Sequence, residues 1–298
     1  MSPFAGAALD AGAYLRDCAR FAAHELGVFA ALAQPSAVGE LAATLGVGAR
    51  RLSALLCVLA LDGAVVRQGA SWRRGEVPAV PGEPVREGWG RIAEVLRRDR
   101  PLARTEEAAR FQAHLAERAV APARELWTRI GAQGALLDAG GGVGVYATAW
   151  LDAGGTAATV VEAQEVVALA ARSVGARVRL VSGDVRTAAL GDVYDVALLS
   201  HVLHLHAPHD CAQIVERAVA ALRPGGQVVV CELEVAADRT GPAAGVLFAL
   251  NMALYTDGGD AYDAGQLIGW LGGAGVVDVH VERFASAPEC VRVWGRRG

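Results

Sequence analysis

Residues 135–144 carry the feature that most constrains how this chain can fold, the segment Ala-Leu-Leu-Asp-Ala-Gly-Gly-Gly-Val-Gly. A short apolar run that includes Asp138 is followed by four glycines within five positions. The run predicts a buried strand, and the glycines predict a tight turn into a helix over residues 145–151. Glycine is needed where the backbone takes positive φ or passes close to a ligand. The first turn of the helix would aim its amide N–H groups and its positive dipole end at that ligand. The segment therefore predicts a small-molecule site built from backbone.

The length and composition indicate a soluble globular protein. A chain of 298 residues suggests two domains or one large one, and 53% hydrophobic residues suffice for a real core. No apolar run approaches the roughly 20 residues needed to span a membrane. The first residues lack the basic start of a secretory signal. Five scattered cysteines without C-x-x-C spacing predict reduced core thiols. We expect a cytoplasmic protein with no membrane partner.

The charged residues exclude some functions. All 28 cationic side chains are arginines, which is explained most simply by GC-rich coding and which rules out a lysine nucleophile. The formal net charge of −4 gives no electrostatic case for nucleic acid as the main partner.

The first hundred residues predict helices followed by a hairpin. Apolar residues follow helical spacing over residues 11–32, Ser36 resembles the N-cap of a second helix that ends near Gly46, and a third helix is predicted over residues 49–61. Two short strands, 65–67 and 71–73, then form a probable hairpin. Helices followed by such a hairpin describe a winged helix.

A winged helix raises the alternative of a DNA-binding regulator. Eleven arginines against six acids lie between Arg50 and Arg104. However, the third helix offers only Arg50 and Arg51 at its start and then leucines and alanines, whereas a reader of base edges needs several polar side chains on one face. The apolar surplus favours protein contact, so we expect a dimerisation role and no nucleic-acid partner.

A turn-rich connector over residues 75–88 separates this region from two further helices, 89–96 and 106–130. We place the domain boundary near residue 100. The prediction is a winged-helix-like dimerisation domain over residues 1–100 and a second domain over residues 101–298.

Strand and helix patterns alternate from residue 135 onward, which predicts an α/β domain with a doubly wound parallel sheet. A final pair of strands with a short turn predicts an antiparallel hairpin at the C-terminus. Ligands of open α/β sheets sit at the carboxyl ends of the strands. The predicted strands cover 135–139, 158–162, 178–182, 194–199, 227–232, 276–284 and 290–294.

The acid at the end of the second of these strands sharpens the choice of ligand. Glu162 follows Gly140 by 22 positions, where an acid accepts the hydroxyls of an adenosine ribose. The dinucleotide fingerprint G-x-G-x-x-G would need a glycine at position 145, which is Val145. The chain instead has G-x-G-x-G, with Gly140, Gly142 and Gly144, the form found with S-adenosylmethionine.

With these motifs in place, the chain resembles the S-adenosylmethionine-dependent O-methyltransferases of the plant caffeate and bacterial polyketide small-molecule type. The resemblance extends over nearly the whole chain, because the helical front half is similar to the dimerisation domain of that family. Four segments carry it: 137–144, 161–162, 182–185, and 222–226 with the strand that ends at Glu232.

The resemblance implies a cofactor site for S-adenosylmethionine. The three glycines would cradle the methionine part beside Asp138. Glu162 would hold the ribose, Asp184 the adenine amino group, and Val185 would pack on the adenine ring. Ser200 falls where the plant enzymes often have lysine, so its contact with adenine would be weaker or different. The alternative for Glu162 and Asp184 is a pair of solvated loop acids.

Four of the seven histidines fall within residues 201–209. The family has its general base in this loop, and counting back from Cys211 aligns His204 with that base. A histidine of pKa about 6.5 can take the proton of a hydroxyl near neutral pH. Glu232 would orient His204 through its other ring nitrogen. A structural role for His204 as a hydrogen-bonded loop residue is the alternative.

The support of this base departs from the family pattern. The aspartate and tryptophan that follow the base in the family are Leu205 and His206 here, and a second family acid is Ala261. His201 and His204 could share one face, but no nearby acid completes a ligand set, so no metal is predicted.

The acceptor would contact a helix around Asn251 and Met252, where the methionine could equally be a core residue. His201, and more weakly Phe111 and His114 on the long helix, are further candidates for substrate binding. The predicted function is methyl transfer from S-adenosylmethionine to a hydroxyl of a small aromatic or polyketide-like natural product by a homodimer. Methylation at carbon or nitrogen, or a different reaction with a retained cofactor site, are the alternatives.

Overall fold

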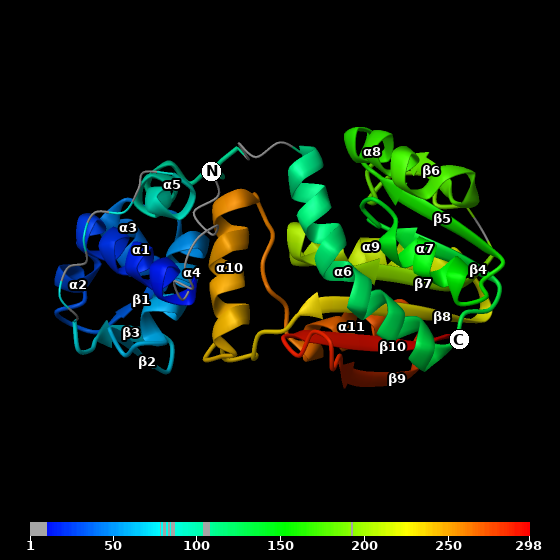
Figure 1. The fold of residues 1–298 in the computed structure, drawn as a ribbon. Coiled ribbons are helices and arrows are strands. Elements are labelled where there is room, and N and C mark those ends of the chain that lie inside the picture. Colours follow the sequence, from blue (N-terminus) through cyan, green and yellow to red (C-terminus); the bar gives the residue numbers. More distant parts are fainter. Residues whose placement is uncertain are drawn as a thin grey trace. The chain divides into compact units, whose positions relative to one another are not determined.

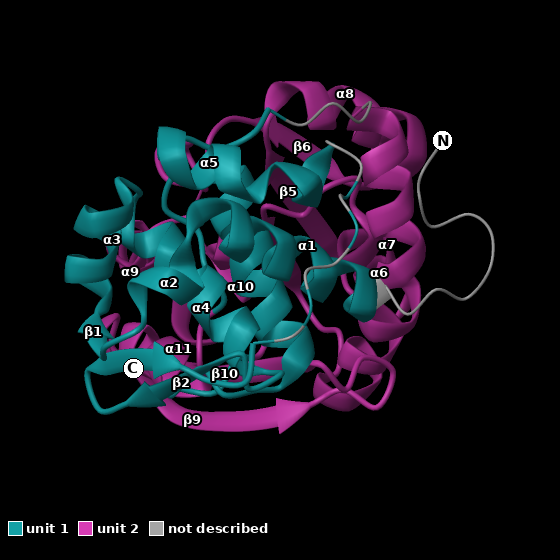
Figure 2. Ribbon diagram, turned by 90° about the vertical axis from the view of Figure 1, so that its left-hand side faces the viewer, with its two compact units in different colours: residues 1–104, 235–261 teal, residues 105–234, 262–298 magenta. Residues whose placement is uncertain are grey.

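The computed structural model describes residues 11–77, 79, 82, 84, 87–103, 108–191 and 193–298. The chain forms two compact units, shown in different colours in Figure 2. Unit 1 comprises residues 1–104 and 235–261, and unit 2 comprises residues 105–234 and 262–298. Each is described by itself.

Unit 1 is mainly helical, with a small sheet. Its strands pair antiparallel in the order β1-β3-β2, so the predicted hairpin is present. Its core gathers the apolar faces of α1, α3, α4, α5 and α10. The elements are α1 (Ala11–Leu26), α2 (Val28–Ala31), β1 (Ser36–Ala37), α3 (Val38–Leu45), α4 (Ala49–Ala60), β2 (Val65–Gln68), β3 (Ser71–Arg74), η1 (Gly88–Arg91), α5 (Ile92–Arg98) and α10 (Ala243–Tyr255) (Figure 1).

Two local predictions in unit 1 were wrong. The first predicted helix is divided at Gly27, which takes φ of 76°. Ser36 is not an N-cap, because it lies in β1 opposite Trp72. Ala37 occupies the cap position of α3, and the backbone N–H of Ala37 donates a hydrogen bond to the carboxylate of Glu40 at 3.3 Å.

Residues 235–261 cluster with unit 1, although the sequence prediction assigned them to the second domain. The reason lies in α10, which is apolar on all sides and is buried along most of its length. A helix of that kind needs cover all round. Within unit 1 it packs against α4, where Leu250 and Leu254 join the same core as Leu52 and Leu55.

Unit 2 contains a seven-stranded sheet in the order β6-β5-β4-β7-β8-β10-β9. The first five strands run parallel, and β10 pairs antiparallel with both β8 and β9. This confirms the predicted α/β sheet with its C-terminal hairpin. The strands are β4 (Ala135–Ala139), β5 (Ala157–Glu162), β6 (Arg179–Ser182), β7 (Tyr194–Ser200), β8 (Leu222–Leu233), β9 (Val276–Arg283) and β10 (Cys290–Arg297).

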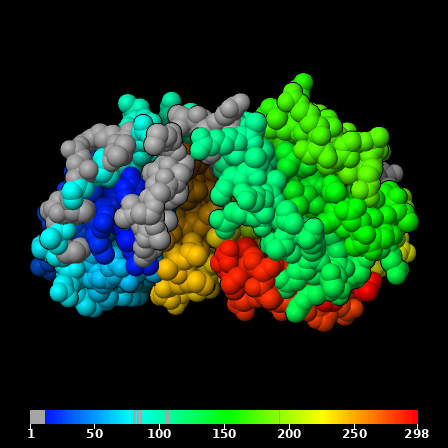
Figure 3. Space-filling view, viewed as in Figure 1, coloured from blue at the N-terminus to red at the C-terminus, as the bar shows by residue number. Residues whose placement is uncertain are grey.

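Helices cover both faces of this sheet. One face is buried by α6, α7 and α8 and the other by α9 and α11. The long helix α6 forms much of the surface of unit 2 on the side shown in Figure 3. Residues 106–107 of its predicted range lie outside the described residues. The helices are α6 (Ala108–Ile130), α7 (Val145–Asp152), α8 (Gln164–Val174), α9 (Pro208–Ala220) and α11 (Ala264–Gly273), with short turns η2 (Gly175–Arg177) and η3 (Leu203–Leu205).

Among the residues with described positions, no one helix has the length and apolar character to cross a membrane. The helices α3 and α4 taken together reach the length and apolar composition of a membrane span, but the chain bends by 109° between them. All five cysteines are buried and free of disulfides, as the sequence predicted.

Candidate active site

The glycine turn connects β4 to α7 in the conformation that the sequence predicted. Gly140, Gly142 and Gly144 have φ of 78°, 56° and 82°, the region in which side chains are rarely tolerated. Gly140 donates its N–H to the carbonyl of Val161 at 2.8 Å, which ties the turn to β5. The space is closed as well: a Cβ on Gly140 would lie 2.6 Å from Val202, and one on Gly144 equally close to Val174.

Asp138 lies directly beneath this turn and is fully buried. A Cβ on Gly141 would lie 2.5 Å from its carboxyl group. Neither carboxyl oxygen has a hydrogen-bond partner in the described part of the chain. Burial, reinforced by the charge of nearby Glu162, raises the pKa of Asp138 to about 7. A carboxyl group held in this way favours a cation above it.

Glu162 closes the second side of the turn from the end of β5. Its Oε2 accepts the N–H of Gly142 at 3.0 Å and its Oε1 accepts the N–H of Ala163 at 2.8 Å. The carboxylate is thus ordered by backbone donors and is part of the turn.

The next loop, after β6, carries Asp184 and Val185. Arg186 holds the Asp184 carboxylate through its guanidinium, with contacts of 2.6 to 3.1 Å, and through its backbone N–H at 2.8 Å. This arginine lowers the pKa of Asp184 to about 2. Val185 is buried behind it, and Ser200 is buried at the end of β7.

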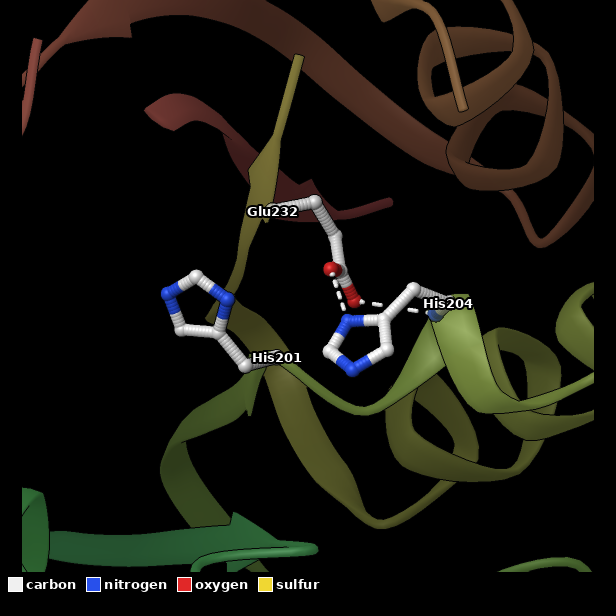
Figure 4. Close-up of side chains that lie close together, drawn as sticks. All are labelled: His201, His204 and Glu232. Atoms are coloured by element: carbon white, nitrogen blue, oxygen red, sulfur yellow. Dashed lines mark hydrogen bonds and ion pairs between the residues drawn. The ribbon is translucent and has the colours of Figure 1, made fainter. Parts of the chain in front are cut away.

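His204 and Glu232 form a buried pair, as predicted. His204 lies in η3 just after β7, and Glu232 lies near the end of β8, the neighbouring strand. The Nδ1 atom of His204 is 2.7 Å from Oε2 of Glu232, and the other ring nitrogen is turned away from the carboxylate (Figure 4). Val202, two residues earlier, is the side chain that packs on Gly140, so the histidine loop lies against the glycine turn.

Glu232 has more than one partner. Its Oε1 accepts the backbone N–H of Leu203 at 2.7 Å and of His204 at 3.3 Å. Burial by itself would raise the pKa of Glu232, but the facing His204 imidazole and these amides hold it below its usual value. The carboxylate therefore stays ionised and fixes both the ring and the backbone of the loop.

Two other residues, Cys211 and Tyr262, contact backbone carbonyls of the loop that carries His204. In this loop Leu205 and His206 stand where the family has aspartate and tryptophan. Cys211 Sγ lies 3.2 Å from the carbonyl oxygen of Leu203, to which it can donate. The Tyr262 hydroxyl donates to the carbonyl of His206, and its ring packs edge-on against Trp270. Leu205 points outward and is 39% exposed.

The prediction that no nearby acid completes a metal-ligand set with His201 and His204 was wrong. An acid does complete a possible ligand set, because single ligand atoms of His201, His204 and Glu232 all lie within 4.8 Å of one another. The sequence missed it because Glu232 comes from a strand 28 residues further along the chain. His201 has a positive φ of 56°, and its Nε2 is 3.9 Å from the thiol of Cys290.

The remaining candidates for substrate binding are spread over both units. Phe111 and the exposed His114 lie on α6 in unit 2, whereas Asn251 and the buried Met252 lie on α10 in unit 1. The amide oxygen of Asn251 accepts the indole N–H of Trp89 at 3.1 Å. The substrate role of Asn251 and Met252 stays a prediction.

Sequence reasoning also missed several residues of this site. The Gln112 side chain reaches the turn, since its Oε1 lies 3.0 Å from the position of a Cβ on Gly142. Tyr262 was missed because nothing in its spacing links it to the loop that it contacts, 56 residues earlier. Arg186 was also missed, although an arginine two residues after a predicted site acid is a usable signal.

The described residues fit S-adenosylmethionine. Its sulfonium and ammonium groups are cations, and the unpaired carboxyl of Asp138 lies under a turn into which no side chain could fit. Two further carboxylates, Glu162 and Asp184, follow at the ends of the next two strands, at the ligand-binding edge of such a sheet.

Comparison with known proteins gives the same assignment. The sequence profile of the O-methyltransferase domain matches residues 103–275. A 3-hydroxy-5-methyl-1-naphthoate 3-O-methyltransferase from Streptomyces sahachiroi is 29% identical over 89% of this chain and 87% of its own. Acetylserotonin O-methyltransferase from Bos taurus is 32% identical over 52% of this chain and 46% of its own.

Solved structures share the fold over almost the whole chain. An O-methyltransferase family 2 protein from Planctomyces limnophilus, in complex with apigenin, is 23% identical, covers 96% of this chain and 93% of its own, and has a TM-score of 0.75. Human N-acetylserotonin methyltransferase in complex with S-adenosylmethionine is 25% identical, covers 97% and 96%, and has a TM-score of 0.63. The chain therefore belongs to the O-methyltransferase domain family, and it is an S-adenosylmethionine-dependent O-methyltransferase.

Proposed function

We propose that this enzyme methylates a hydroxyl group of a small aromatic or polyketide-like natural product and that His204 is its general base. The observation that carries the proposal is the 2.7 Å contact between His204 Nδ1 and the buried carboxylate of Glu232, on a loop packed against the glycine turn. The acceptor class is supported by relatives named for a naphthoate and for acetylserotonin.

In this proposal the two ring nitrogens have separate roles. Nδ1 of His204 carries the proton that faces Glu232, which leaves Nε2 to receive the proton of the acceptor hydroxyl. S-adenosylmethionine, when bound, supplies a methyl group activated by its positively charged sulfur. The acceptor oxygen would form its new bond to the methyl carbon as the bond from that carbon to sulfur breaks and S-adenosylhomocysteine leaves, while the hydroxyl proton passes to Nε2. The imidazolium that results is stabilised by Glu232, whose pKa is held low.

The cofactor would be held by the residues around the turn. The backbone of residues 140–144 would receive the methionine part over Asp138, Glu162 would accept the ribose hydroxyls, and Asp184 with Val185 would contact the adenine. Arg186 keeps Asp184 ionised and therefore acceptor-only. Much of the rate acceleration would come from holding oxygen, methyl carbon and sulfur in line.

The test of the base is His204→Ala, compared with His209→Ala. His209 is an exposed histidine of the same stretch that contacts Gln213. Methyl transfer from labelled S-adenosylmethionine to a panel of phenols and hydroxynaphthoates identifies an acceptor first. With it, H204A is expected to lower kcat by about 10²- to 10⁴-fold, while H209A stays within twofold. Both variants should bind S-adenosylhomocysteine like the parent by calorimetry. Unchanged turnover of H204A would overturn the base assignment.

A second candidate, metal-assisted methylation, is favoured by the proximity of His201 to His204 and Glu232. A metal on this set would compete for the groups that form the base pair. Chelation followed by elemental analysis separates the two: the base mechanism expects full kcat in metal-free protein. Loss of activity that only one added metal restores would favour the second candidate.

We also propose that the enzyme is a cytoplasmic homodimer associated through unit 1, as the resemblance implies. The leucines of α4 that suggested a contact surface are buried in the core of unit 1, so they do not form the interface themselves. Arg51 is buried too, and both Arg50 and Arg51 donate to backbone carbonyls of residues 253–259. These contacts argue against the DNA-binding alternative.

A further inference from the structure

Unit 1 contains a cavity of about 400 Å³ that none of the residues proposed for the cofactor or for the base lines. Its walls come from α3, α4, the β2–β3 hairpin, α10 and three residues that flank α10, and all of these belong to unit 1. The three flanking residues are Ala237, Arg239 and Asp260. Cavities of this size are typical of sites for small organic molecules.

Three arginines from separate segments line the cavity, against one acid. Arg50 donates to the carbonyls of Gly259 and Thr256 at 2.9 and 3.1 Å. Arg239 pairs with both oxygens of Asp260 at 2.7 and 2.8 Å. These contacts fix the guanidinium groups in place, and the carboxylate of Asp260 offsets the charge of Arg239.

Arg67 is the third arginine, and its contacts are weaker. It donates to the carbonyls of Gly69 at 3.2 Å and Asp238 at 3.4 Å, and its guanidinium lies 5.8 Å from the ring centre of Trp72. The carboxylate of Asp238 accepts from the backbone and hydroxyl of Thr240 and is not part of the lining. Among the described residues of the lining, three arginines therefore stand against one acid, Asp260, and the carboxylate of Asp238 lies close enough to Arg67 for the two charges to interact.

The rest of the lining is apolar or aromatic. Trp72 offers an indole next to Arg67, and Val246, Ala249 and Ala253 of α10 form an apolar wall. A phosphate alone would fit the charge but would leave this wall uncovered. A flat apolar body that bears one carboxylate matches both parts, because arginine binds carboxylates in a bidentate manner and stacks on aromatic faces.

We propose that this cavity binds a small aromatic carboxylate, as a second ligand site separate from the residues proposed for methyl transfer. The carboxylate lies between Arg50 and Arg67, and the ring lies along Trp72 and the wall from α10. A site of this kind lets an aromatic acid be recognised by unit 1 whether or not it is itself methylated.

The test is a calorimetric titration of the full-length protein with 1-naphthoate, 1-naphthol and inorganic phosphate. We expect saturable binding of 1-naphthoate, at least tenfold weaker binding of 1-naphthol, which lacks the carboxylate, and no comparable binding of phosphate. Arg67→Met should weaken the binding of 1-naphthoate by about tenfold or more. The matched control is Arg73→Met, which removes an arginine of the same hairpin that does not line the cavity.

A second variant tests the cavity without touching its charge. Ala54→Leu places a larger side chain into the lining and should also weaken 1-naphthoate, with S-adenosylhomocysteine binding unchanged as evidence of an intact fold. If R67M and A54L bind 1-naphthoate like the parent, the acid binds elsewhere and the proposal is overturned. It is also overturned if R67M changes the oligomeric state and leaves 1-naphthoate binding intact, because the arginines would then serve a second copy of the chain. Failure of the methyl-transfer assay would not affect either result.

Discussion

At the scale of single residues, two buried acids of unit 2 show how partners decide ionisation. Glu232 and Asp138 are at most 1% exposed. Glu232 faces an imidazole and two backbone N–H groups, so its pKa is lowered in spite of burial. Asp138 faces no side-chain partner, and burial, which outweighs the nearby backbone N–H of Ala147, raises its pKa to about 7. The first is suited to stabilise a positive charge that forms during the reaction, and the second to receive a charge that arrives with the cofactor.

Asp138→Asn tests the second role through stability. An acid whose pKa is raised from 3.8 to about 7 on folding binds its proton more tightly in the native state, so it costs stability as pH rises through this range. Without cofactor, D138N should therefore be more stable than the parent at pH 8.5, by about 2–4 kcal/mol. At pH 4 the two should differ little. The measurement is urea unfolding at both values, and an equal difference at both would contradict it.

The same variant should bind S-adenosylhomocysteine and S-adenosylmethionine more weakly at pH 8.5. The neutral amide would lack the negative charge that Asp138 offers there.

At the scale of elements, the short turn η3 depends on contacts from three other segments. β8 supplies Glu232, α9 supplies Cys211, and Tyr262 comes from the residues just before α11. The orientation of His204 is thus a property of packing between elements.

Tyr262→Phe tests this bracing, with Tyr194→Phe as its control. Each tyrosine is buried in unit 2 and donates its hydroxyl to a backbone carbonyl, of His206 and of Leu190 respectively. Each variant should lose about 1 kcal/mol of stability. Only Y262F should lower kcat, by about three- to tenfold, with unchanged binding of S-adenosylhomocysteine. Equal kcat values for the two variants would show that the Tyr262 contact does not position the base.

The glycine turn is the second element that can be tested alone. Gly144→Ala would force a side chain into φ of 82° and within 2.6 Å of Val174, so we expect a loss of about 1–3 kcal/mol and weaker binding of S-adenosylhomocysteine. Gly269→Ala is the control, because Gly269 lies within α11 with nothing within 4 Å of a new Cβ. That variant should gain about 0.5–1 kcal/mol. Cofactor binding that G144A leaves intact would remove the turn from the site.

At the scale of the whole molecule, the chain leaves the sheet unit after β8 and returns to it before α11. The excursion over residues 235–261 carries α10 into unit 1, so the two units are linked by more than one chain crossing. The match of solved methyltransferases to more than nine-tenths of the chain shows that both units belong to the shared fold.

The proposed homodimer makes a prediction at this scale. Light scattering coupled to size-exclusion chromatography should give twice the 30.8 kDa mass of one chain. Because the relevant surface is proposed to lie on unit 1, Arg74→Met, a change at an exposed residue of the hairpin, is the first variant to compare with the parent for a shift in mass. A single-chain mass for the parent at micromolar concentration would contradict the proposal.

The features of the fold and the site that could be predicted are those that depend on local chemistry. The alternation of strands and helices, the glycine turn with positive φ and the acids that end β5 and β8 could be predicted because backbone conformation and periodicity are written in neighbouring residues. The pairing of His204 with Glu232 could also be predicted, since the carboxyl ends of adjacent parallel strands meet at one edge of a sheet.

Which distant side chains meet depends on the folding of the whole chain. The contact of Tyr262 with the carbonyl of His206, the approach of Gln112 to the turn and the closeness of His201 to Glu232 join residues that are 30 to 56 positions apart, and no local pattern marks them. The assignment of α10 to unit 1 and the convergence of Arg50, Arg67 and Arg239 on one cavity have the same origin. Burial of apolar surface brings such segments together, and it depends on the whole chain at once.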